Sequence, residues 1–359
     1  MIRVDLVDPP AYTPPYDHAL AAALARAGAE VRLVTSRFAF GETPPPDGYR
    51  TSEVFYRHAR GAAGSRLRTA TKALEHLPDT LRYRAAAAAD VVHFQWLAVP
   101  WLDLRLLPNR PVVLTIHDPI AHAPARLLRA LPAAVVHTEA ARNAVLRQGL
   151  DPARVHVIRH GAFTHLTPLA AGAALPPELP ADGKPIALCF GLIRPYKGIE
   201  TLLEAWRGVD GAELWIVGRP LFDIAPLRAA APPGVRFVPR FVSDSEVAAL
   251  YDRADLVVLP YARGGRFGFS GVLATALGFG RPAVVSDVEG FAELVALGAA
   301  RAVPAGDAGA LGRVLRELLG DPDERERLAA EARAAAKGPY SWDAVARATL
   351  DLYETIRAK

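Results

Sequence analysis

Arg194 and Lys197 are the residues whose type and spacing most directly indicate chemistry, because these two cations lie three positions apart just after Gly191. Residues 185–190 form a short apolar run typical of a buried strand, and residues 199–206 space apolar side chains like an amphipathic helix. The two cations therefore lie on a predicted strand-to-helix loop. In parallel α/β sheets ligands bind outside the carboxyl ends of strands, where a guanidinium and an ammonium can neutralise a diphosphate. The alternative is a solvated basic turn.

A glycine-rich loop precedes the helix predicted over residues 273–277. Its sequence is Gly264, Gly265, Arg266, Phe267, Gly268, Phe269, Ser270, Gly271 and Val272. Backbone amides at a helix start preceded by small residues bind anions without charged side chains. Two anion-binding devices in one half of the chain favour a diphosphate ligand. The chain has neither a GxGxxG nor a Walker pattern, so an NAD or ATP site lacks its fingerprint.

Two polar segments follow predicted strands in the first half of the chain. Tyr16, Asp17 and His18 come after the first strand, where they either contact an acceptor or simply begin the next helix. His117 and Asp118 end a later strand. A histidine beside an aspartate can orient a substrate hydroxyl, and a purely structural histidine is the alternative.

The order of predicted elements indicates two domains. Strands alternate with helices in both halves of the 359-residue chain, which predicts an α/β fold of two doubly wound parallel sheets facing each other across a cleft. We expect an N-terminal domain over residues 1–165 and a second domain over residues 183–340. Residues 162–182 are rich in Pro, Ala and Gly, so they predict a linker. A final helix is expected within residues 341–359.

The composition excludes several classes of protein. No run of eighteen apolar residues occurs and charges interrupt the N-terminus, so we expect neither a membrane span nor a signal peptide, and the cytoplasm is the expected compartment. Cys189 is the single cysteine, which excludes an internal disulfide and a thiol-ligated metal site.

A basic segment lies between Arg57 and Arg84. It holds seven Lys and Arg against Glu75 and Asp79, and seven minus two leaves +5, more than the net +4 of the whole chain. Such a helix can lie on an anionic membrane surface or meet a lipid-phosphate substrate. An ordinary solvated helix is the alternative, and nucleic acid is not expected, since no DNA-reading pattern is present.

These motifs together resemble the retaining GT-B glycosyltransferases of family 4, over nearly the whole chain. Residues 191–198 are similar to the family's donor-diphosphate motif, which implies that Gly191, Arg194 and Lys197 contact the phosphates of a nucleotide sugar. Gly218 resembles the strand end before the nucleotide-base loop, and His117 matches a histidine near the transferred sugar.

Other segments share the resemblance. They are residues 158–161, similar to the domain-end turn, and residues 257–261 and 278–287, similar to the frame of the donor loop. The last helix, from Ser341, resembles the family's segment that crosses back to the first domain.

One departure from the family is serious. Its two glutamates, eight positions apart, are replaced here by Phe267 and Thr275. The stretch Ser270, Gly271 and Val272 is similar to a subgroup that reads S-G-V at this loop, and its amides can still hold phosphate. Candidates for a compensating carboxylate are Asp118, Glu289 and Glu293.

The resemblance implies a metal-independent hexosyltransferase-type enzyme that moves a sugar, with retention, from a UDP-, GDP- or dTDP-sugar to a hydroxyl acceptor. No cofactor is expected beside this co-substrate, and the acceptor is a glycan, a lipid-linked glycan or a small molecule in polysaccharide, glycolipid or glycoconjugate biosynthesis. The predicted catalytic residues are His117, Asp118, Arg194 and Lys197. The predicted donor-binding residues are Gly191, Arg194, Lys197, Gly218, Phe269, Ser270, Gly271, Val272 and Thr275, and the predicted acceptor-binding residues are Tyr16, Asp17 and His18.

Two other functions remain open at this point. A phosphorylase or epimerase can share the scaffold, and the missing glutamates also suit a protein that binds nucleotide sugar without turnover.

Overall fold

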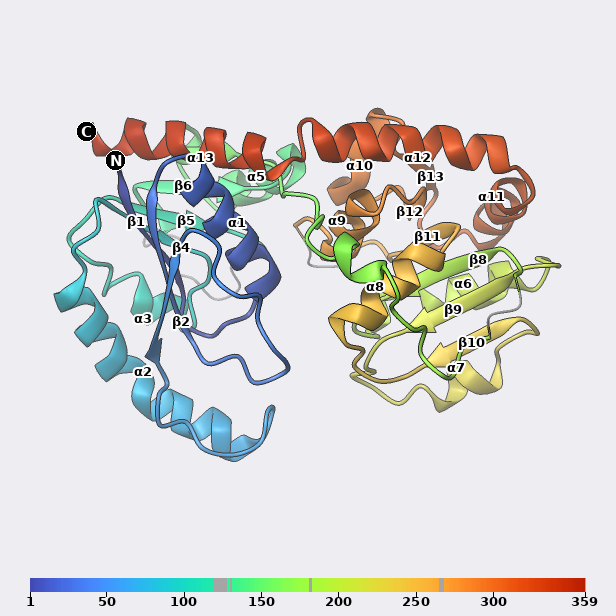
Figure 1. Cartoon of the computed structure of the whole chain (residues 1–359), viewed down its shortest axis with the longest axis horizontal. Coiled ribbons are helices and arrows are strands. Elements are labelled where there is room, and N and C mark those ends of the chain that lie inside the picture. Colours follow the sequence, from blue (N-terminus) through green and yellow to red (C-terminus); the bar gives the residue numbers. More distant parts are fainter. Residues whose placement is uncertain (119–127, 130, 181–182, 265–267, 359) are drawn as a thin grey trace. The chain divides into compact units, whose positions relative to one another are not determined.

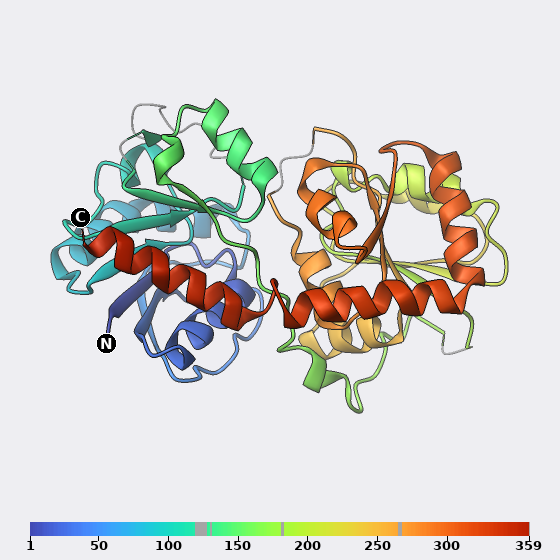
Figure 2. The ribbon, with the colours of Figure 1, turned by 90° about the horizontal axis from the view of Figure 1, so that it is seen from above.

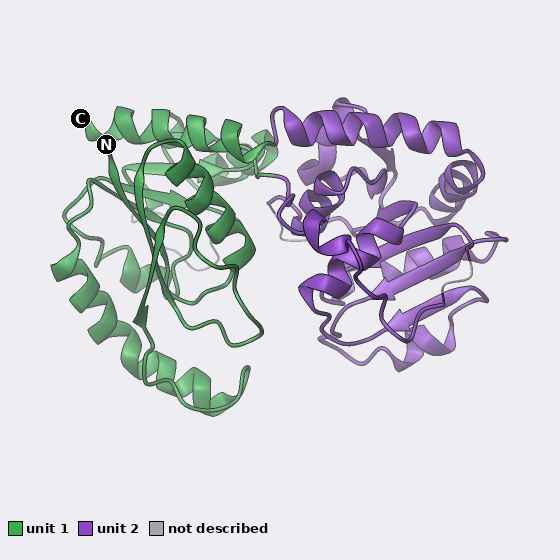
Figure 3. Cartoon of the chain, in the orientation of Figure 1, with its two compact units in different colours: residues 1–161, 341–359 green, residues 162–340 purple. Residues whose placement is uncertain are grey.

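The computed structural model describes residues 1–118, 128–129, 131–180, 183–264 and 268–358. The chain divides into two compact units (Figure 3). Unit 1 comprises residues 1–161 and 341–359, and unit 2 comprises residues 162–340.

Unit 1 is built on a parallel sheet in the order β3-β2-β1-β4-β5-β6-β7 (Figure 1). Its strands are β1 Arg3–Asp8, β2 Glu30–Ser36, β3 Arg50–Phe55, β4 Val91–Phe94, β5 Val112–Thr115, β6 Ala133–Val136 and β7 Val155–Val157. The helices of this unit are α1 Pro14–Arg26, α2 Arg66–Ala86, α3 Pro100–Asp103, α5 Glu139–Arg147, η1 Pro152–Arg154 and α13 Trp342–Arg357.

Unit 2 contains a second parallel sheet, in the order β10-β9-β8-β11-β12-β13. Its strands are β8 Ile186–Phe190, β9 Glu213–Val217, β10 Val235–Val238, β11 Leu256–Leu259, β12 Ala283–Ser286 and β13 Ala300–Val303. The helices are η2 Thr167–Ala170, η3 Pro195–Lys197, α6 Ile199–Trp206, α7 Ala225–Ala229, α8 Asp244–Arg253, α9 Gly271–Gly278, η4 Glu289–Phe291, α10 Ala292–Ala296, α11 Ala308–Gly320 and α12 Pro322–Lys337.

The expected α/β class and the doubly wound parallel sheets are confirmed. The central strands are short apolar runs because helices cover both faces of each sheet and leave no polar side. In each sheet the chain adds strands first on one side of its first strand and then on the other. The first strand of unit 1, β1, therefore pairs with both β2 and β4, and the first strand of unit 2, β8, pairs with both β9 and β11. Such reversals open a crevice at the carboxyl ends of the strands.

The described part of residues 162–182 belongs to unit 2 and does not form a separate linker. Leu166 and Leu179 are buried in the core of that unit. The amide of Phe163 donates to the carbonyl oxygen of Ala274, which fixes the start of the segment on α9. Its Pro-, Ala- and Gly-rich composition indicated a linker, yet a few leucines were sufficient to anchor it.

The C-terminal helix α13 packs against α1 within unit 1, and Figure 2 shows it as the red helix beside the blue α1. Trp342 is buried at its start, where a Cβ atom at Gly161 would overlap with the indole ring. Glycine at position 161 therefore permits the docking of α13.

A cluster of buried histidines lies between α1, α13 and the ends of the strands. The ring of Tyr16 packs against His117, His137 and His160 at centroid distances of 4.8, 5.3 and 4.8 Å. His93 bridges the hydroxyls of Tyr353 in α13 and Thr115 in β5, at 2.6 and 2.7 Å. The rings of His93, His137 and His160 serve as core side chains.

Burial makes these histidines hard to protonate, because desolvation penalises the charged imidazolium. It lowers the pKa of His93 and of His160 to about 3, and the pKa of His137 to about 4. The pKa of His117 is also lowered, first by burial and then by neighbouring His137.

We therefore predict that the free energy of unfolding falls as the pH drops below about 6.5. In the unfolded chain histidine binds a proton near that pH, whereas in the folded chain His93, His137 and His160 stay neutral to about pH 4 or below, so protons favour unfolding. Each histidine contributes about 1.4 kcal/mol per pH unit in this window. Urea unfolding at several pH values between about 7.5 and 4.5 measures the slope.

Buried carboxyl groups such as Asp17 also contribute to the pH dependence of stability. The variant His93→Gln separates the contribution of one histidine from theirs. Its stability should depend on pH less steeply than that of the wild type by about one proton. The control His58→Gln alters an exposed ring. A slope that both variants share with the wild type would contradict this account.

Candidate active site

The loop after β8 is held tightly against its neighbours in unit 2. The amide of Gly191 donates to the carbonyl oxygen of Val217 at the end of β9, at 2.9 Å. Gly198 adopts φ +66°, and a Cβ atom there would overlap with the carbonyl oxygen of Pro260 after β11. Only glycine combines this backbone conformation with this close approach. The short helix η3, which carries Lys197, is thereby fixed at the carboxyl edge of the sheet.

Lys197 is a buried cation, with 6% of its surface exposed. Its Nζ donates to the hydroxyl of Tyr261 and lies 4.4 Å from the centre of that ring. Burial lowers the pKa of Lys197. Within the described residues no carboxylate pairs with this ammonium. A buried charge without a counter-charge is costly, so an anionic ligand at this point would stabilise it.

The start of α9 lies beside the same ammonium. The hydroxyl of Tyr261 is 3.2 Å from Oγ of Ser270, the residue at the N-cap position of α9. A Cβ atom at Gly191 would lie 3.2 Å from a methyl of Val272 and 3.4 Å from Nζ of Lys197. The structure thus brings together the loop cation and the first residues of α9, two features that the sequence indicated separately.

The other predicted donor residues occupy different positions around this point. Gly218 has φ +146° and would overlap with the carbonyl oxygen of Gly191 if it carried a Cβ, so it sets the spacing between β8 and β9. Gly271 is exposed at the helix start, while the ring of Phe269 stacks on Tyr340 at 5.8 Å. Arg194 is exposed on the loop.

Thr275, which stands where the family has a glutamate, is buried in α9. Its hydroxyl donates to the carbonyl oxygen of Gly271 at 2.9 Å, so this group is engaged within the helix. The other replaced position, Phe267, lies outside the described residues together with Gly265 and Arg266.

In unit 1 the predicted acceptor residues lie on the buried face of α1. Tyr16, Asp17 and His18 are 3%, 2% and 6% exposed. Nδ1 of His18 lies 2.5 Å from the hydroxyl of Tyr49. Burial and the nearby charge of Asp8 raise the pKa of Asp17. The three side chains position α1 and line none of the hollows described below.

His117 is partly buried, stacked on Trp96 at a centroid distance of 5.1 Å. Nδ1 of His137 donates to the carbonyl oxygen of Ile158, so the neutral ring of His137 accepts at Nε2 from Nδ1 of His117, 3.3 Å away. Nε2 of His117 is therefore an acceptor, and it has no hydrogen-bond partner among the described residues. Asp118 is exposed next to it.

Two adjoining hollows of about 350 and 710 Å³ open at the carboxyl ends of β1, β2 and β3. Their linings include Tyr12, Phe38, Phe40, Tyr56 and Lys72, residues that the sequence did not single out as a site. The only early signal was the excess of positive charge between Arg57 and Arg84.

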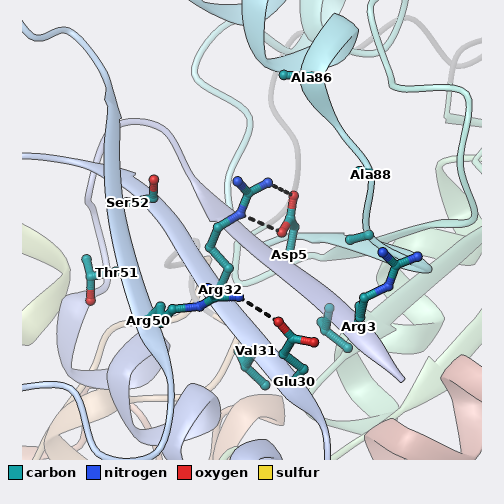
Figure 4. A pocket seen from close by; sticks show the side chains of 12 residues that line it. Arg3, Asp5, Glu30, Val31, Arg32, Arg50, Thr51, Ser52, Ala86 and Ala88 are labelled. Carbon is teal, nitrogen blue, oxygen red and sulfur yellow. Dashed lines mark hydrogen bonds and ion pairs between the residues drawn. The ribbon is translucent and has the colours of Figure 1, made fainter. Parts of the chain in front are cut away.

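A third hollow, of about 370 Å³, lies at the amino-terminal ends of the same strands (Figure 4). Its three arginines each face an acid: Arg3 pairs with Asp90, Arg32 with Asp5 and Arg50 with Glu30, at 2.9, 2.6 and 2.6 Å. Its charges are thus neutralised within the protein, as expected of a structural ion-pair network.

No helix in the described ranges is both long and apolar enough to cross a lipid bilayer. Over the same ranges, no group of three His, Cys, Asp or Glu side chains is arranged to hold a metal ion.

Two family models match the chain. The model described as Glycosyltransferase Family 4 matches residues 16–165, and the model described as Glycosyl transferases group 1 matches residues 184–321.

Similar proteins agree with these matches. A D-inositol 3-phosphate glycosyltransferase from Xylanimonas cellulosilytica is 30% identical, over 93% of this chain and 89% of that protein. A phosphatidyl-myo-inositol mannosyltransferase from Mycobacterium leprae is 37% identical, over 49% of this chain and 48% of that protein, so the match spans about half of that relative.

Among solved structures, Alr3699/HepE from Anabaena in complex with UDP-glucose has a TM-score of 0.70 at 17% identity, covering 99% of this chain and 100% of that chain. At this identity the likeness concerns the fold alone. Taken with the family models and the full-length relative, it shows that the chain belongs to glycosyltransferase family 4 and has the two parallel-sheet units of the GT-B fold.

Proposed function

We propose that the protein transfers a sugar, with retention at the anomeric carbon and without a metal ion, from a nucleotide diphosphate to a hydroxyl acceptor. The observation that carries this proposal is the buried ammonium of Lys197, which lacks a carboxylate partner in the described part of the chain and lies beside the start of α9. A diphosphate supplies the charge that this position lacks. Retention is what the resemblance to family 4 implies.

The leaving nucleotide diphosphate gains negative charge as the bond to the sugar breaks. Lys197 and Arg194 stabilise that charge, together with the backbone amides from Ser270 to Val272 at the positive end of α9. The absent side chain at Gly191, beside Nζ of Lys197 and a methyl of Val272, leaves room for close approach by the phosphates. The UDP-glucose complex of the Anabaena structure supports a UDP-sugar donor, and GDP- and dTDP-sugars remain candidates.

His117 contributes an acceptor of fixed orientation. Because its Nδ1–H is committed to His137, the buried Nε2 of His117 keeps a lone pair to which a sugar hydroxyl can donate. Asp118, exposed beside it, is the candidate for a carboxylate near the reacting sugar. With Thr275 engaged inside α9, the phosphate-binding cations carry most of the stabilisation.

The first prediction concerns these cations. Arg194→Ala and Lys197→Met should each lower turnover about 100-fold, since a preorganised charge of this kind supplies on the order of 3 kcal/mol to the transition state. Release of nucleoside diphosphate from a panel of nucleotide sugars measures turnover, and thermal unfolding reports whether folding is intact.

Arg207→Ala is the matched control, because Arg207 is an exposed cation in the same unit, at the end of α6. Turnover like that of the wild type in both loop variants would refute the assignment. Calorimetric binding of a nucleotide sugar without turnover across an acceptor panel would instead identify a non-catalytic binding protein.

A second prediction concerns the metal and the stereochemistry. Turnover should be unchanged in excess EDTA, because the proposed stabilisation comes from protein cations and amides. The product formed from an α-linked donor should carry an α-linkage, which the anomeric coupling constant in a proton NMR spectrum reports. Loss of activity in EDTA that Mg²⁺ or Mn²⁺ restores, or a β-linked product, would contradict this mechanism.

We further propose that the protein acts in the cytoplasm and that α2 attaches it to the inner face of the membrane. The helix buries His76, Asp79, Thr80 and Tyr83, whereas its leucines face outward. Leu67, Leu74, Leu77 and Leu81 are 59%, 79%, 44% and 44% exposed. Exposed arginines flank this apolar stripe, among them Arg66 and Arg84. An apolar face bordered by cations suits the surface of an anionic bilayer.

This proposal predicts that the protein co-sediments with vesicles containing phosphatidylglycerol and that Leu74→Glu lowers the bound fraction severalfold, since the change places a charge in the apolar face. Leu221→Glu, at a leucine of unit 2 that is 46% exposed, is the matched control. Equal binding by both variants would remove α2 from the membrane surface.

A further inference from the structure

The two adjoining hollows at the carboxyl ends of β1, β2 and β3 combine aromatic walls with positive charge. The smaller one is lined by the rings of Tyr12, Phe38, Phe40 and Tyr56, and the two share Arg37 and Arg68. The smaller hollow also includes Lys72, and the larger one Arg57 and the acidic Glu53. At about 350 and 710 Å³ both have the volume of small-molecule sites.

The cations of these hollows have no carboxylate partner within the described ranges. Lys72 lies 4.8 Å from the centre of the Tyr56 ring, and Arg68 reaches only the carbonyl oxygen of Ala59, at 3.4 Å. Arg57 donates to another carbonyl oxygen, that of Glu53, at 2.9 Å. In the hollow of Figure 4, by contrast, every arginine faces an acid. The cations at the carboxyl edge thus leave their charge available to an anion.

The backbone of the smaller hollow is strained at two places. Ala11 and Tyr56 have φ values of 55° and 53°, and they are the non-glycine residues with positive φ in the described part of the chain. Both line this hollow. Such conformations cost of order 1–3 kcal/mol each and cluster at ligand sites.

Buried polar contacts hold Tyr56 in this conformation. Its amide donates to Asp79 at 2.7 Å, and its hydroxyl lies 2.8 Å from Nδ1 of His76. Nε2 of His76 in turn lies 2.7 Å from Asp103. This chain of contacts fixes an aromatic wall next to Lys72, so the hollow is preorganised.

We propose that these hollows bind the acceptor of the reaction and that the acceptor is a phosphate-bearing polyol. The phosphate contacts Arg37, Arg68 and Lys72, because a doubly charged group with several oxygens satisfies cations that come from different elements. The polyol ring lies against Tyr56 and Tyr12, whose aromatic faces suit the C–H surface of a sugar-like ring. The role as acceptor rests on the proposed transfer reaction, whereas the binding itself does not.

Calorimetry on the full chain, in the absence of any nucleotide sugar, tests the binding. Glucose 6-phosphate should bind at least tenfold more tightly than glucose, and inorganic phosphate should compete with it. A second arm uses vesicles of phosphatidylglycerol, a lipid-borne phosphate with a polyol, against vesicles of phosphatidylcholine. Preference for the soluble or for the lipid-borne probe identifies the source of the phosphate.

Arg37→Ala and Arg68→Ala should each weaken binding of the preferred probe at least tenfold. Arg147→Ala is the matched control, because this arginine is exposed on α5 of the same unit and lines neither hollow. Equal affinity for glucose and glucose 6-phosphate together with no saturable binding to phosphatidylglycerol would overturn the proposal. Unchanged affinity in both hollow variants would also overturn it.

The donor variant Arg194→Ala should bind the phosphate probe like the wild type. Failure of this inference is therefore separable from failure of the proposed function: the first shows in the probe affinities of the Arg37 and Arg68 variants, and the second in the turnover of the Arg194 and Lys197 variants.

Discussion

The contact between the ammonium of Lys197 and Tyr261 organises the candidate donor site of unit 2. It joins the loop after β8, the segment after β11 and, through Ser270, the start of α9. Gly198, next to Lys197, lets the loop press against the carbonyl oxygen of Pro260, next to Tyr261. The close approaches of Gly198 to Pro260 and of Gly218 to Gly191, together with the ring of Tyr261, thus hold a desolvated cation in place before any ligand arrives. An electrostatic mechanism requires this preorganisation.

The sequence predicted the fold well because a parallel α/β fold depends on local patterns, and the donor loop, which local patterns also indicated, stays a prediction. Buried parallel strands need continuous apolar runs, and a phosphate loop needs glycine and cations at a strand end. Either feature can therefore be recognised in a segment of about ten residues. Tyr16, Asp17 and His18 were different. They follow a strand, as site residues often do, but α1 begins at Pro14 and its rotation turns them inward. That rotation depends on packing against α13, some 320 residues away in the chain, which no local pattern reveals.

Helix α2 shows the same limit in another form. The side of this helix that faces the protein is the polar one, and its leucines are exposed. His76, Asp79 and Tyr83 find buried partners in Asp103, the amide of Tyr56 and Asp5, and each partner belongs to a different element. Hydrophobic periodicity assumes that the apolar face is the buried face, so it misassigns a helix whose buried contacts are hydrogen bonds. The hollows beside α2 were missed for the same reason.

The way the chain passes between the two units has a consequence for its synthesis. The amide of Ala162, the first residue of unit 2, donates to the carbonyl oxygen of Tyr340, the last residue of that unit, so its two ends meet. Unit 2 is one continuous segment and holds all of its sheet when the ribosome reaches residue 340. Unit 1 still lacks α13 at that point, and Tyr353 and Trp342 with it. The sheet of unit 1 is therefore completed after unit 2, because its helix α13 is synthesised only once residues 162–340 have been made.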